Sequence, residues 1–329
     1  MALLRKFNSK IKSEINTGFG VNASDYGGRF VNKDGKANIE KSGIGFFERM
    51  SWYHTLLSLP AWKFFFIIFI FFIAINLLFA LVYFLIGVQH LGGMVSNSTG
   101  EKFAEAFFFS CQTFTTVGYG RINPVGFATS AIAAFEALVG LLSFALATGL
   151  LYGRFARPKA YLRFSENAIV APYKEITALM FRVAPFKNAT LVDAEVKVTL
   201  GMIMEENGKP VNKFFQLPLE FSTVNALTLS WTIVHPITET SPLYKFTKED
   251  FENTSGEILV FLKAFDDMFS NTVVARTSYT FKEIVVGAKF KPMFMRSGEG
   301  NKTILHLDKL NSFVPADINF SYVEEKNAG

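Results

Sequence analysis

The sequence predicts a membrane protein with two membrane-crossing α-helices, a short re-entrant helix between them, and an all-β sandwich domain after them. Two long apolar stretches, Phe64–Val88 and Phe127–Phe155, are each long enough to cross a bilayer as a helix. A shorter helical stretch between them is followed by the sequence Thr-Val-Gly-Tyr-Gly at residues 116–120. From about residue 160, short β-rich runs separated by turn residues replace the long apolar stretches.

Composition agrees with a membrane domain followed by a globular one. Half of the 329 residues are hydrophobic, 38 are phenylalanine, and the apolar residues concentrate in the first half of the chain. The net charge of +5 favours an anionic membrane surface over nucleic acid as a partner, because basic residues flank the predicted spans and no dense basic helix is present. Cys111 is the only cysteine, which excludes an intrachain disulfide and a thiolate metal cluster. The polar N-terminal stretch lacks the apolar core of a cleavable signal peptide.

Residues 1–48 form the predicted N-terminal cytoplasmic segment, which is basic at its start and rich in Gly, Asn and Lys. Asp34–Gly35 marks a turn, and Arg29–Val31 is expected to add a short strand to the edge of another sheet. Residues 49–62 mix aromatic residues and leucines with polar residues, which is typical of an amphipathic "slide" helix in the headgroup layer. The alternative is a helix of a soluble core; the interfacial helix is favoured because a membrane span follows directly.

The predicted membrane domain covers residues 63–155. Its first span, residues 64–88, has no charge, and Pro60 ends the preceding helix or redirects the chain. Asn76 is expected to pack against another helix. The re-entrant helix, residues 101–113, is too short to cross the bilayer. Its partially negative C-terminal end therefore points into the membrane and favours a cation there.

Thr116-Val117-Gly118-Tyr119-Gly120 follows the re-entrant helix. Glycine adopts backbone angles that other residues resist, and alternating angles turn successive carbonyl oxygens to one side of a strand. Several copies around an axis then form stacked oxygen rings that replace the hydration shell of a cation, and TVGYG is the filter sequence of potassium channels. We therefore predict a selectivity filter that binds K⁺ and no other cofactor. K⁺ is expected at Thr116, Val117, Gly118 and Tyr119. The alternative is a Gly-Tyr-Gly turn in a loop.

The second span, residues 127–155, carries Glu136 as its only charge before Arg154. An ionisable group at membrane depth is costly and marks a functional site by default. Glu136 is predicted to face the pore or to support the filter; the alternative is a structural pair with a neighbouring donor behind the filter. Gly149 permits close packing or bending of this helix.

The charge distribution predicts that both termini are cytoplasmic, because the loop between the spans is poor in Lys and Arg. Basic residues that flank the spans outside that loop include Arg5, Lys6, Lys10 and Lys12 before the first span, and Arg154, Arg157, Lys159 and Arg163 after the second. The second group and Lys63 form a basic collar at the membrane boundary, which we expect to bind anionic lipids and to set a gate. The alternative is that the collar only fixes topology.

Residues 156–329 are predicted to form a cytoplasmic two-sheet sandwich of immunoglobulin-like type. Strands are expected at residues 178–184, 193–200, 227–234 and 258–262, and a helix at residues 247–251. No nucleophile–base constellation or phosphate-binding glycine loop is evident, and His235 and His306 are lone histidines. The chain is therefore not expected to be an enzyme.

Several motifs together resemble the inward-rectifier potassium channels, especially their bacterial members, over roughly residues 19–310. The filter alone is compatible with any potassium channel. The stretches that resemble this family in particular are Arg29–Gly35, Ala156–Pro158, Trp231–His235, Ser241–Tyr244, Ala275–Tyr279 and Glu283–Ile284. The resemblance implies a K⁺-conducting homotetramer in a bacterial inner membrane, gated from the cytoplasmic side by lipids or ligands.

The resemblance also assigns individual positions. Tyr152 lies where the family places a bulky constriction, so we assign it to the gate with Gly149. Lys187 matches a lipid-binding position. Gln112 stands in place of a filter-supporting glutamate, while Arg121 keeps the basic partner.

Three further positions bear on rectification. Phe144 replaces an acidic, polyamine-binding residue of strong rectifiers, and Lys263 replaces a second acid. Asp193 matches an acidic residue of the cytoplasmic pore. These departures imply weak rectification, with only weak block by polyamines or Mg²⁺.

Two rival functions remain open. One is a membrane-anchored β-sandwich binding module with a non-conducting pore, which an absence of flux would support. The other is a ligand-gated potassium channel outside this family. The β-rich C-terminal domain argues against the second, because other ligand domains of potassium channels have α/β folds.

Overall fold

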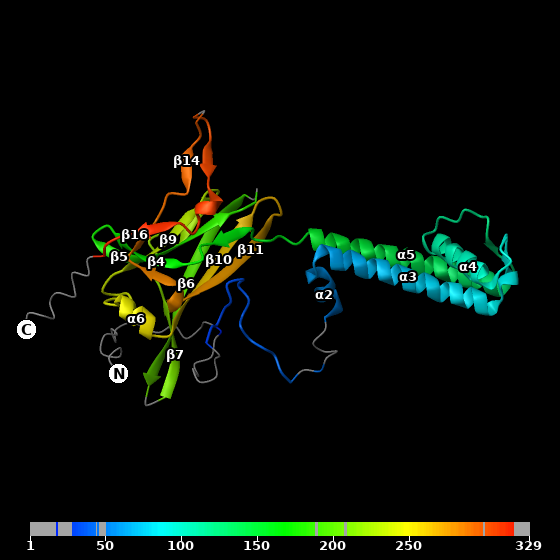
Figure 1. Cartoon of the computed structure of the whole chain (residues 1–329), viewed down its shortest axis with the longest axis horizontal. Coiled ribbons are helices and arrows are strands. Elements are labelled where there is room, and N and C mark those ends of the chain that lie inside the picture. Colours follow the sequence, from blue (N-terminus) through cyan, green and yellow to red (C-terminus); the bar gives the residue numbers. More distant parts are fainter. Residues whose placement is uncertain are drawn as a thin grey trace, which may run out of the picture. The chain divides into compact units, whose positions relative to one another are not determined.

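The chain forms two compact units in the computed structural model, which we describe separately (Figure 1). The helical unit is Ser42–Arg157, and the β unit is Met1–Lys41 with Pro158–Gly329. The structure describes Gly18, residues 28–43, Gly45 and residues 51–187, 190–206, 209–298 and 300–318. The basic residues Arg5, Lys6, Lys10 and Lys12 of the predicted topology signal lie outside the described residues, as does the start of the predicted interfacial helix.

The helical unit contains two long apolar helices, α3 (Ala61–Ile86) and α5 (Phe127–Phe155), both long and apolar enough to cross a membrane. The shorter helix α4 (Thr99–Phe114) packs against both of them. The remaining elements are α2 (Trp52–Ser58), η3 (Val88–His90), β1 (Leu91–Gly92) and β2 (Asn123–Pro124). Most side chains of α3 and α5 are exposed in the single chain, as expected for helices whose outer faces contact lipid or another subunit.

The segment before the first span divides at Pro60, which changes the bounds predicted for it. Pro60 has extended backbone and precedes α3, so Ala61 and Trp62 belong to the span instead of the interfacial helix. Proline is favoured at such a helix start because its missing N–H is not needed there. The span ends at Ile86 because Gly87 adopts a φ of 117°, which a helix does not accommodate.

The re-entrant helix α4 is longer than predicted at both ends. Its N-terminus is Thr99 because the Ser98 side chain accepts a hydrogen bond from the Glu101 N–H, which caps the helix. Its C-terminus approaches α5 at Gly140, where an added Cβ would lie 2.0 Å from the Phe114 carbonyl oxygen. Glycine is therefore required at position 140 for α5 to pack this closely against the end of α4.

The β unit is a sandwich of two five-stranded sheets, which confirms the predicted all-β fold. One sheet has the order β11-β10-β6-β7 with β8 paired to β6, and the other has the order β12-β4-β5-β3 with β9 paired to β5. The strands of the first sheet are β6 (Leu191–Glu206), β7 (Lys209–Gln216), β8 (Thr223–Leu227), β10 (Gly256–Asp266) and β11 (Asn271–Thr280). The strands of the second are β3 (Leu162–Phe164), β4 (Ala168–Tyr173), β5 (Ile176–Pro185), β9 (Trp231–Ile237) and β12 (Ile284–Val286). Alternate residues from both sheets form one buried core.

Shorter elements complete the β unit. Helix α6 (Lys248–Asn253) begins with a capping box formed by Thr247 and Asp250. The others are η4 (Phe281–Glu283), β13 (Ala288–Phe290), β14 (Phe294–Arg296), β15 (Thr303–Leu305), η5 (Leu307–Lys309) and β16 (Phe313–Pro315). Strands β13 and β16 pair with each other, as do β14 and β15.

The single strand predicted at residues 227–234 is wrong, because the chain changes sheets within it. Leu227 ends β8, which pairs with β6, and Trp231 begins β9, which pairs with β5. Both halves are β-rich, so a pattern based on propensity does not detect the crossing between them.

The strand predicted at Arg29–Val31 is also corrected, since only an isolated bridge between Val31 and Ala37 forms there. Side chains hold this N-terminal strap, residues 28–38, against the sandwich. The buried carboxylate of Glu257 accepts hydrogen bonds from the N–H groups of Phe30 (2.6 Å) and Val31 (3.1 Å). Arg29 pairs with Glu283 at 3.1 Å. The strap is therefore attached by charge-assisted hydrogen bonds instead of a strand ladder.

His235 is a buried residue that forms two hydrogen bonds within the β unit. Its Nδ1 donates to the Pro218 carbonyl at 2.6 Å, and its Nε2 lies 2.7 Å from the Ser241 hydroxyl. Burial lowers the pKa of His235 to about 4, so the imidazole is neutral at physiological pH. His235 therefore joins the loop after β9, which contains Ser241, to the connection between β7 and β8, which contains Pro218.

Candidate functional site

The predicted filter follows α4 as an exposed segment with alternating backbone conformation. Thr116, Gly118 and Gly120 have φ values of 58°, 53° and 85°. Positive φ at every second residue turns successive carbonyl groups toward the same side of the segment. Threonine rarely adopts this conformation, so Thr116 marks a strained backbone of the kind found at functional sites.

The start of the filter is tied to the last turn of α4. The Gln112 carbonyl oxygen accepts hydrogen bonds from the N–H groups of Val117 (2.9 Å) and Gly118 (3.3 Å). The Thr116 N–H donates to the Thr113 carbonyl at 3.0 Å. The contact of Gln112 with the predicted filter is thus made by its backbone carbonyl, and its role in supporting a filter stays a prediction.

The end of the filter is held by an ion pair that the sequence did not reveal. Arg121 Nη1 lies 3.0 Å from Glu105 Oε1, and the Glu105 side chain is nearly buried. The other oxygen of Glu105 accepts hydrogen bonds from the N–H groups of Val95 and Ser96, both at 3.3 Å. One carboxylate therefore connects α4 to the loops on both sides of it. Glu105 is the acidic partner of Arg121, at a different position of α4 from Gln112.

Glu136 lies behind α4, where it joins all three helices of the unit. Its carboxyl group is fully buried and accepts a hydrogen bond from the Tyr83 hydroxyl of α3 at 2.6 Å. Its other oxygen is hydrogen-bonded to the Ser110 hydroxyl of α4. Ser110 also contacts Asn76 Oδ1 of α3 at 2.9 Å. Glu136 is thus on the α4-facing side of α5 and away from its exposed face.

Comparisons with known proteins identify the family. A family model described as Inward rectifier potassium channel C-terminal domain matches residues 162–327, and one described as Ion channel matches residues 65–156. The Inward rectifier potassium channel Kirbac3.1 of Paramagnetospirillum magnetotacticum is 33% identical over 281 residues, which cover 84% of this chain and 92% of the relative.

The chain belongs to the inward-rectifier potassium channel family.

A mammalian inward rectifier is also similar to this chain, at a lower sequence identity. The ATP-sensitive inward rectifier potassium channel 12 of Mus musculus is 30% identical over 290 residues, which cover 80% of this chain and 67% of the relative. A solved structure of the sporulation control protein Spo0M of Bacillus subtilis matches 51% of this chain and 71% of that chain with a TM-score of 0.20 and 13% identity, which is too weak to support an inference. Family membership confirms the resemblance and, with the two apolar helices, shows that the chain is a membrane protein.

The cavity and gate positions that the inward-rectifier resemblance assigned lie on α5. Phe144 and Tyr152 are 73% and 75% exposed in the single chain, so both side chains are free to face a central pore. An added Cβ at Gly149 would meet open space, so this glycine is not required for packing within the chain. Phe144 lines an apolar pocket of about 600 Å³ that also contacts Phe72, Phe114 and Thr116.

The cytoplasmic pore positions of the inward-rectifier pattern lie on the exposed face of one sheet. Lys263 of β10 is opposite Glu195 of β6 in the strand register. Asp193 adopts a φ of 47° at a bulge near the start of β6. Glu195 also lies 3.7 Å from Lys197. Glu195, an acidic residue that the sequence did not single out, therefore lies opposite Lys263 in the sheet and pairs with Lys197.

Two of the basic collar residues of the helical unit, Lys63 and Arg154, lie next to aromatic rings. Lys63 Nζ lies 5.3 Å from the centre of the Trp62 ring, and the Arg154 guanidinium lies 5.3 Å from the Phe64 ring. Each cation therefore lies within cation–π distance of a ring at one end of the spans.

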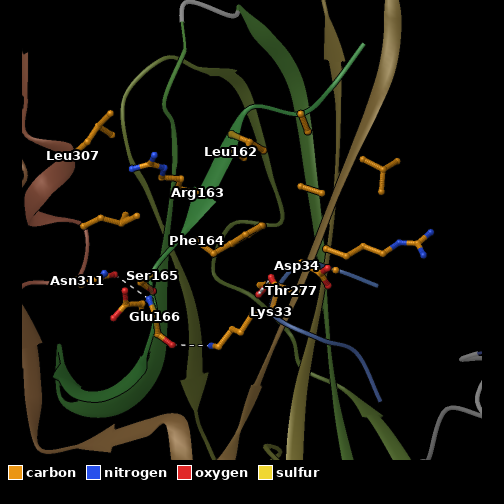
Figure 2. Close-up of a pocket in the computed structure, with 16 residues that line it drawn as sticks. Lys33, Asp34, Leu162, Arg163, Phe164, Ser165, Glu166, Thr277, Leu307 and Asn311 are labelled. Atoms are coloured by element: carbon orange, nitrogen blue, oxygen red, sulfur yellow. Dashed lines mark hydrogen bonds between the residues drawn. The ribbon is translucent and has the colours of Figure 1, made fainter. Parts of the chain in front are cut away.

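In the β unit, Arg163 and Lys187 surround one aromatic pair. The Tyr161 and Phe186 rings meet edge to face, with Lys187 4.1 Å from the first ring and Arg163 4.8 Å from the second. Arg163 also lines a pocket of about 860 Å³ between the N-terminal strap, β3 and the turn at residues 307–311 (Figure 2). The structure thus brings together two of the predicted lipid-binding residues.

The Glu105–Arg121 pair supports a prediction about the filter. Glu105→Gln removes the charge that holds Arg121 and weakens the hydrogen bonds from residues 95 and 96. Leaving such a group without its partner costs about 1–3 kcal/mol, so we expect K⁺ flux in liposomes to fall by about tenfold. Glu101→Gln, on the exposed first turn of the same helix, is the matched control and is expected to leave flux unchanged. Equal flux in both variants would show that the pair does not stabilise the filter.

Proposed function

We propose that the chain forms a homotetrameric, potassium-selective channel with weak inward rectification. The observation that carries this proposal is the alternating backbone at residues 116, 118 and 120. Within the part of the chain that the structure describes, the carbonyl oxygens of residues 116, 118 and 120 accept no backbone hydrogen bond. Four copies around an axis supply the oxygen rings that a dehydrated K⁺ requires. The chain is similar in sequence to channels named as inward rectifiers of potassium, which supports the same function.

The supporting groups around the filter fit this role. Gln112, Arg121 and Glu136 would position the filter, and the exposed Phe144 and Tyr152 would line the cavity and the gate below it. The uncharged Phe144 and the basic Lys263 argue for weak block by polyamines and Mg²⁺, because neither attracts a polyvalent cation. Both termini would be cytoplasmic, since basic residues follow the second span and the loop between the spans lacks them.

Anionic lipids are the proposed ligand that sets the gate. The proposed contacts are the collar residues Lys63, Arg154, Arg157, Lys159, Arg163 and Lys187. Each basic group near an anionic surface contributes about 1 kcal/mol, so several together can bias a gate whose states differ by a few kcal/mol. The lipid phosphates can either favour opening or hold the gate closed, and the experiment below determines which.

Charge removal in the collar tests the lipid proposal. We expect Arg157→Gln with Lys159→Gln to change the dependence of K⁺ flux on anionic-lipid content by at least about tenfold in concentration, because about 2 kcal/mol of attraction is lost per subunit and about 1.4 kcal/mol already corresponds to tenfold. The measurement is flux in liposomes of graded anionic-lipid content. Lys289→Gln with Lys291→Gln, which removes the same charge from the exposed side chains of β13 and the residue after it, is the control. If the unmodified protein, the collar variant and the control variant show the same lipid dependence, the collar residues fix membrane topology and do not set the gate.

A further inference from the structure

The side chains of Asn76, Tyr83, Ser110 and Glu136 form a continuous series of hydrogen bonds. The donors and acceptors in this series determine whether Glu136 carries a proton. All four side chains are buried, with exposed fractions of 0–1%. The series runs from the Phe72 carbonyl through Asn76, Ser110 and Glu136 to the Tyr83 hydroxyl. It lies within the helical unit and connects α3, α4 and α5.

The hydrogen bond to Phe72 fixes the orientation of the Asn76 amide. Its Nδ2 donates to the Phe72 carbonyl at 2.7 Å. A carbonyl only accepts hydrogen bonds, so the nitrogen must face Phe72 and the oxygen must face Ser110. Asn76 therefore presents an acceptor to the Ser110 hydroxyl at 2.9 Å.

The Ser110 hydroxyl has a single proton, so it can donate to Asn76 or to Glu136 but not to both. A serine hydroxyl donates one hydrogen bond and accepts others. If it donates to Asn76, the short contact between Ser110 and Glu136 needs a proton from Glu136. If Ser110 instead donates to an ionised Glu136, two oxygen acceptors face each other at 2.9 Å in a buried site, which is strongly unfavourable. Tyr83 donates to the second carboxyl oxygen in either case and does not supply the missing proton to Ser110.

The surroundings of Glu136 agree with a neutral group. Among the described residues, no Lys, Arg or His forms an ion pair with it. The titratable groups on the two helices packed against it are Lys63 and Tyr83 on α3, and Glu101, Lys102, Glu105 and Cys111 on α4. Glu105 is paired with Arg121. A carboxylate at this depth with no cation partner is costly, and a carboxylic acid is not.

We propose that Glu136 is a protonated carboxylic acid that donates a hydrogen bond to Ser110, and that this neutral network positions the pore helix α4. Glu136 is thus a positioning residue for conduction and does not contact the ion. If Glu136 lost its proton, Ser110 could donate a hydrogen bond to Asn76 or to Glu136 but not to both. The contact of α4 with either α3 or α5 would then be lost. The effect on conduction rests on the proposed channel function, whereas the protonation state does not.

Infrared difference spectroscopy of the purified full-length protein tests the protonation directly. We expect a protonated-carboxyl C=O band at neutral pH that is absent in Glu136→Gln. Ser110→Ala should shift this band, because the acid loses its acceptor. Glu101→Gln, at an exposed carboxylate of α4, should leave the band unchanged. The absence of a band that depends on Glu136 would overturn the proposal.

Flux measurements test the consequence. Gln at position 136 keeps a donor for Ser110 and an acceptor for Tyr83, so Glu136→Gln should conduct K⁺ within about twofold of the unmodified protein, whereas Glu136→Ala should lose most of its flux. Flux through the unmodified protein should fall at alkaline pH, and flux through Glu136→Gln should not. If Glu136→Gln is as impaired as Glu136→Ala, the carboxyl group is ionised and the proposal is wrong. A protein with the band but no flux would contradict the channel function and leave the protonation supported.

Discussion

Gly118→Ala is expected to abolish selective K⁺ flux. Gly118 has a φ of 53°, in the left-handed region where an L side chain costs about 1–2 kcal/mol. Four subunits would add this strain at the same level of the filter, or roughly 4–8 kcal/mol in total. An added Cβ there meets no atom within 4 Å, so the effect comes from backbone conformation and not from a steric clash within the chain.

Gly100→Ala is the matched control for that substitution. Gly100 lies in the first turn of α4, where an added Cβ also meets no atom and φ is ordinary for a helix. The measurement is K⁺ and Na⁺ flux in liposomes for both variants. We expect the control to conduct like the unmodified protein and Gly118→Ala to lose at least tenfold in K⁺ flux or its preference over Na⁺, as about 1.4 kcal/mol already corresponds to tenfold. Unchanged selectivity in Gly118→Ala would show that residues 116–120 do not select the ion.

Phe144→Asp is expected to convert weak block by internal spermine into strong block. Phe144 is largely exposed on α5, so an aspartate there would add a ring of four carboxylates to the cavity of the proposed tetramer. Opposite charges about 4 Å apart attract by roughly 4 kcal/mol at an effective dielectric constant of 20. Even half of that attraction lowers the spermine concentration needed for block by more than about 10-fold. Because spermine carries several charges, we expect that concentration to fall by about 100-fold.

Phe144→Asn separates charge from the change in size and polarity. It resembles aspartate in shape but carries no charge, so we expect it to remain weakly blocked. The measurement is the spermine concentration that halves outward K⁺ current at a fixed voltage. Tight block of the unmodified channel by low spermine would contradict the roles given to Phe144 and Lys263.

Long periodic patterns and one motif made most of the fold predictable. Two apolar stretches are enough to specify α3 and α5, since crossing a membrane requires both length and the absence of charge. The β sandwich followed from alternating strands. The break between Leu227 and Trp231 was missed because strand propensity does not indicate to which sheet a segment pairs.

The predicted filter motif was visible in the sequence, but the side-chain contacts around it were not. The contact between Glu105 and Arg121 joins residues on either side of the filter, and pattern reasoning chose Gln112 because of its place in the motif. The signal that would have found Glu105 is charge: between Phe64 and Phe135, the only charged residues are Glu101, Lys102, Glu105 and Arg121. Glu136 was singled out by its charge, but its partners are neutral side chains on other helices, which a sequence does not pair.

Flux through the unmodified protein in liposomes, with K⁺ and Na⁺ gradients measured in parallel on the same preparation, tests most directly whether residues 116–120 select K⁺. If residues 116–120 form a potassium filter, K⁺ flux should exceed Na⁺ flux by at least about 100-fold, which corresponds to a preference of at least about 2.8 kcal/mol. Comparable K⁺ and Na⁺ fluxes would contradict the account.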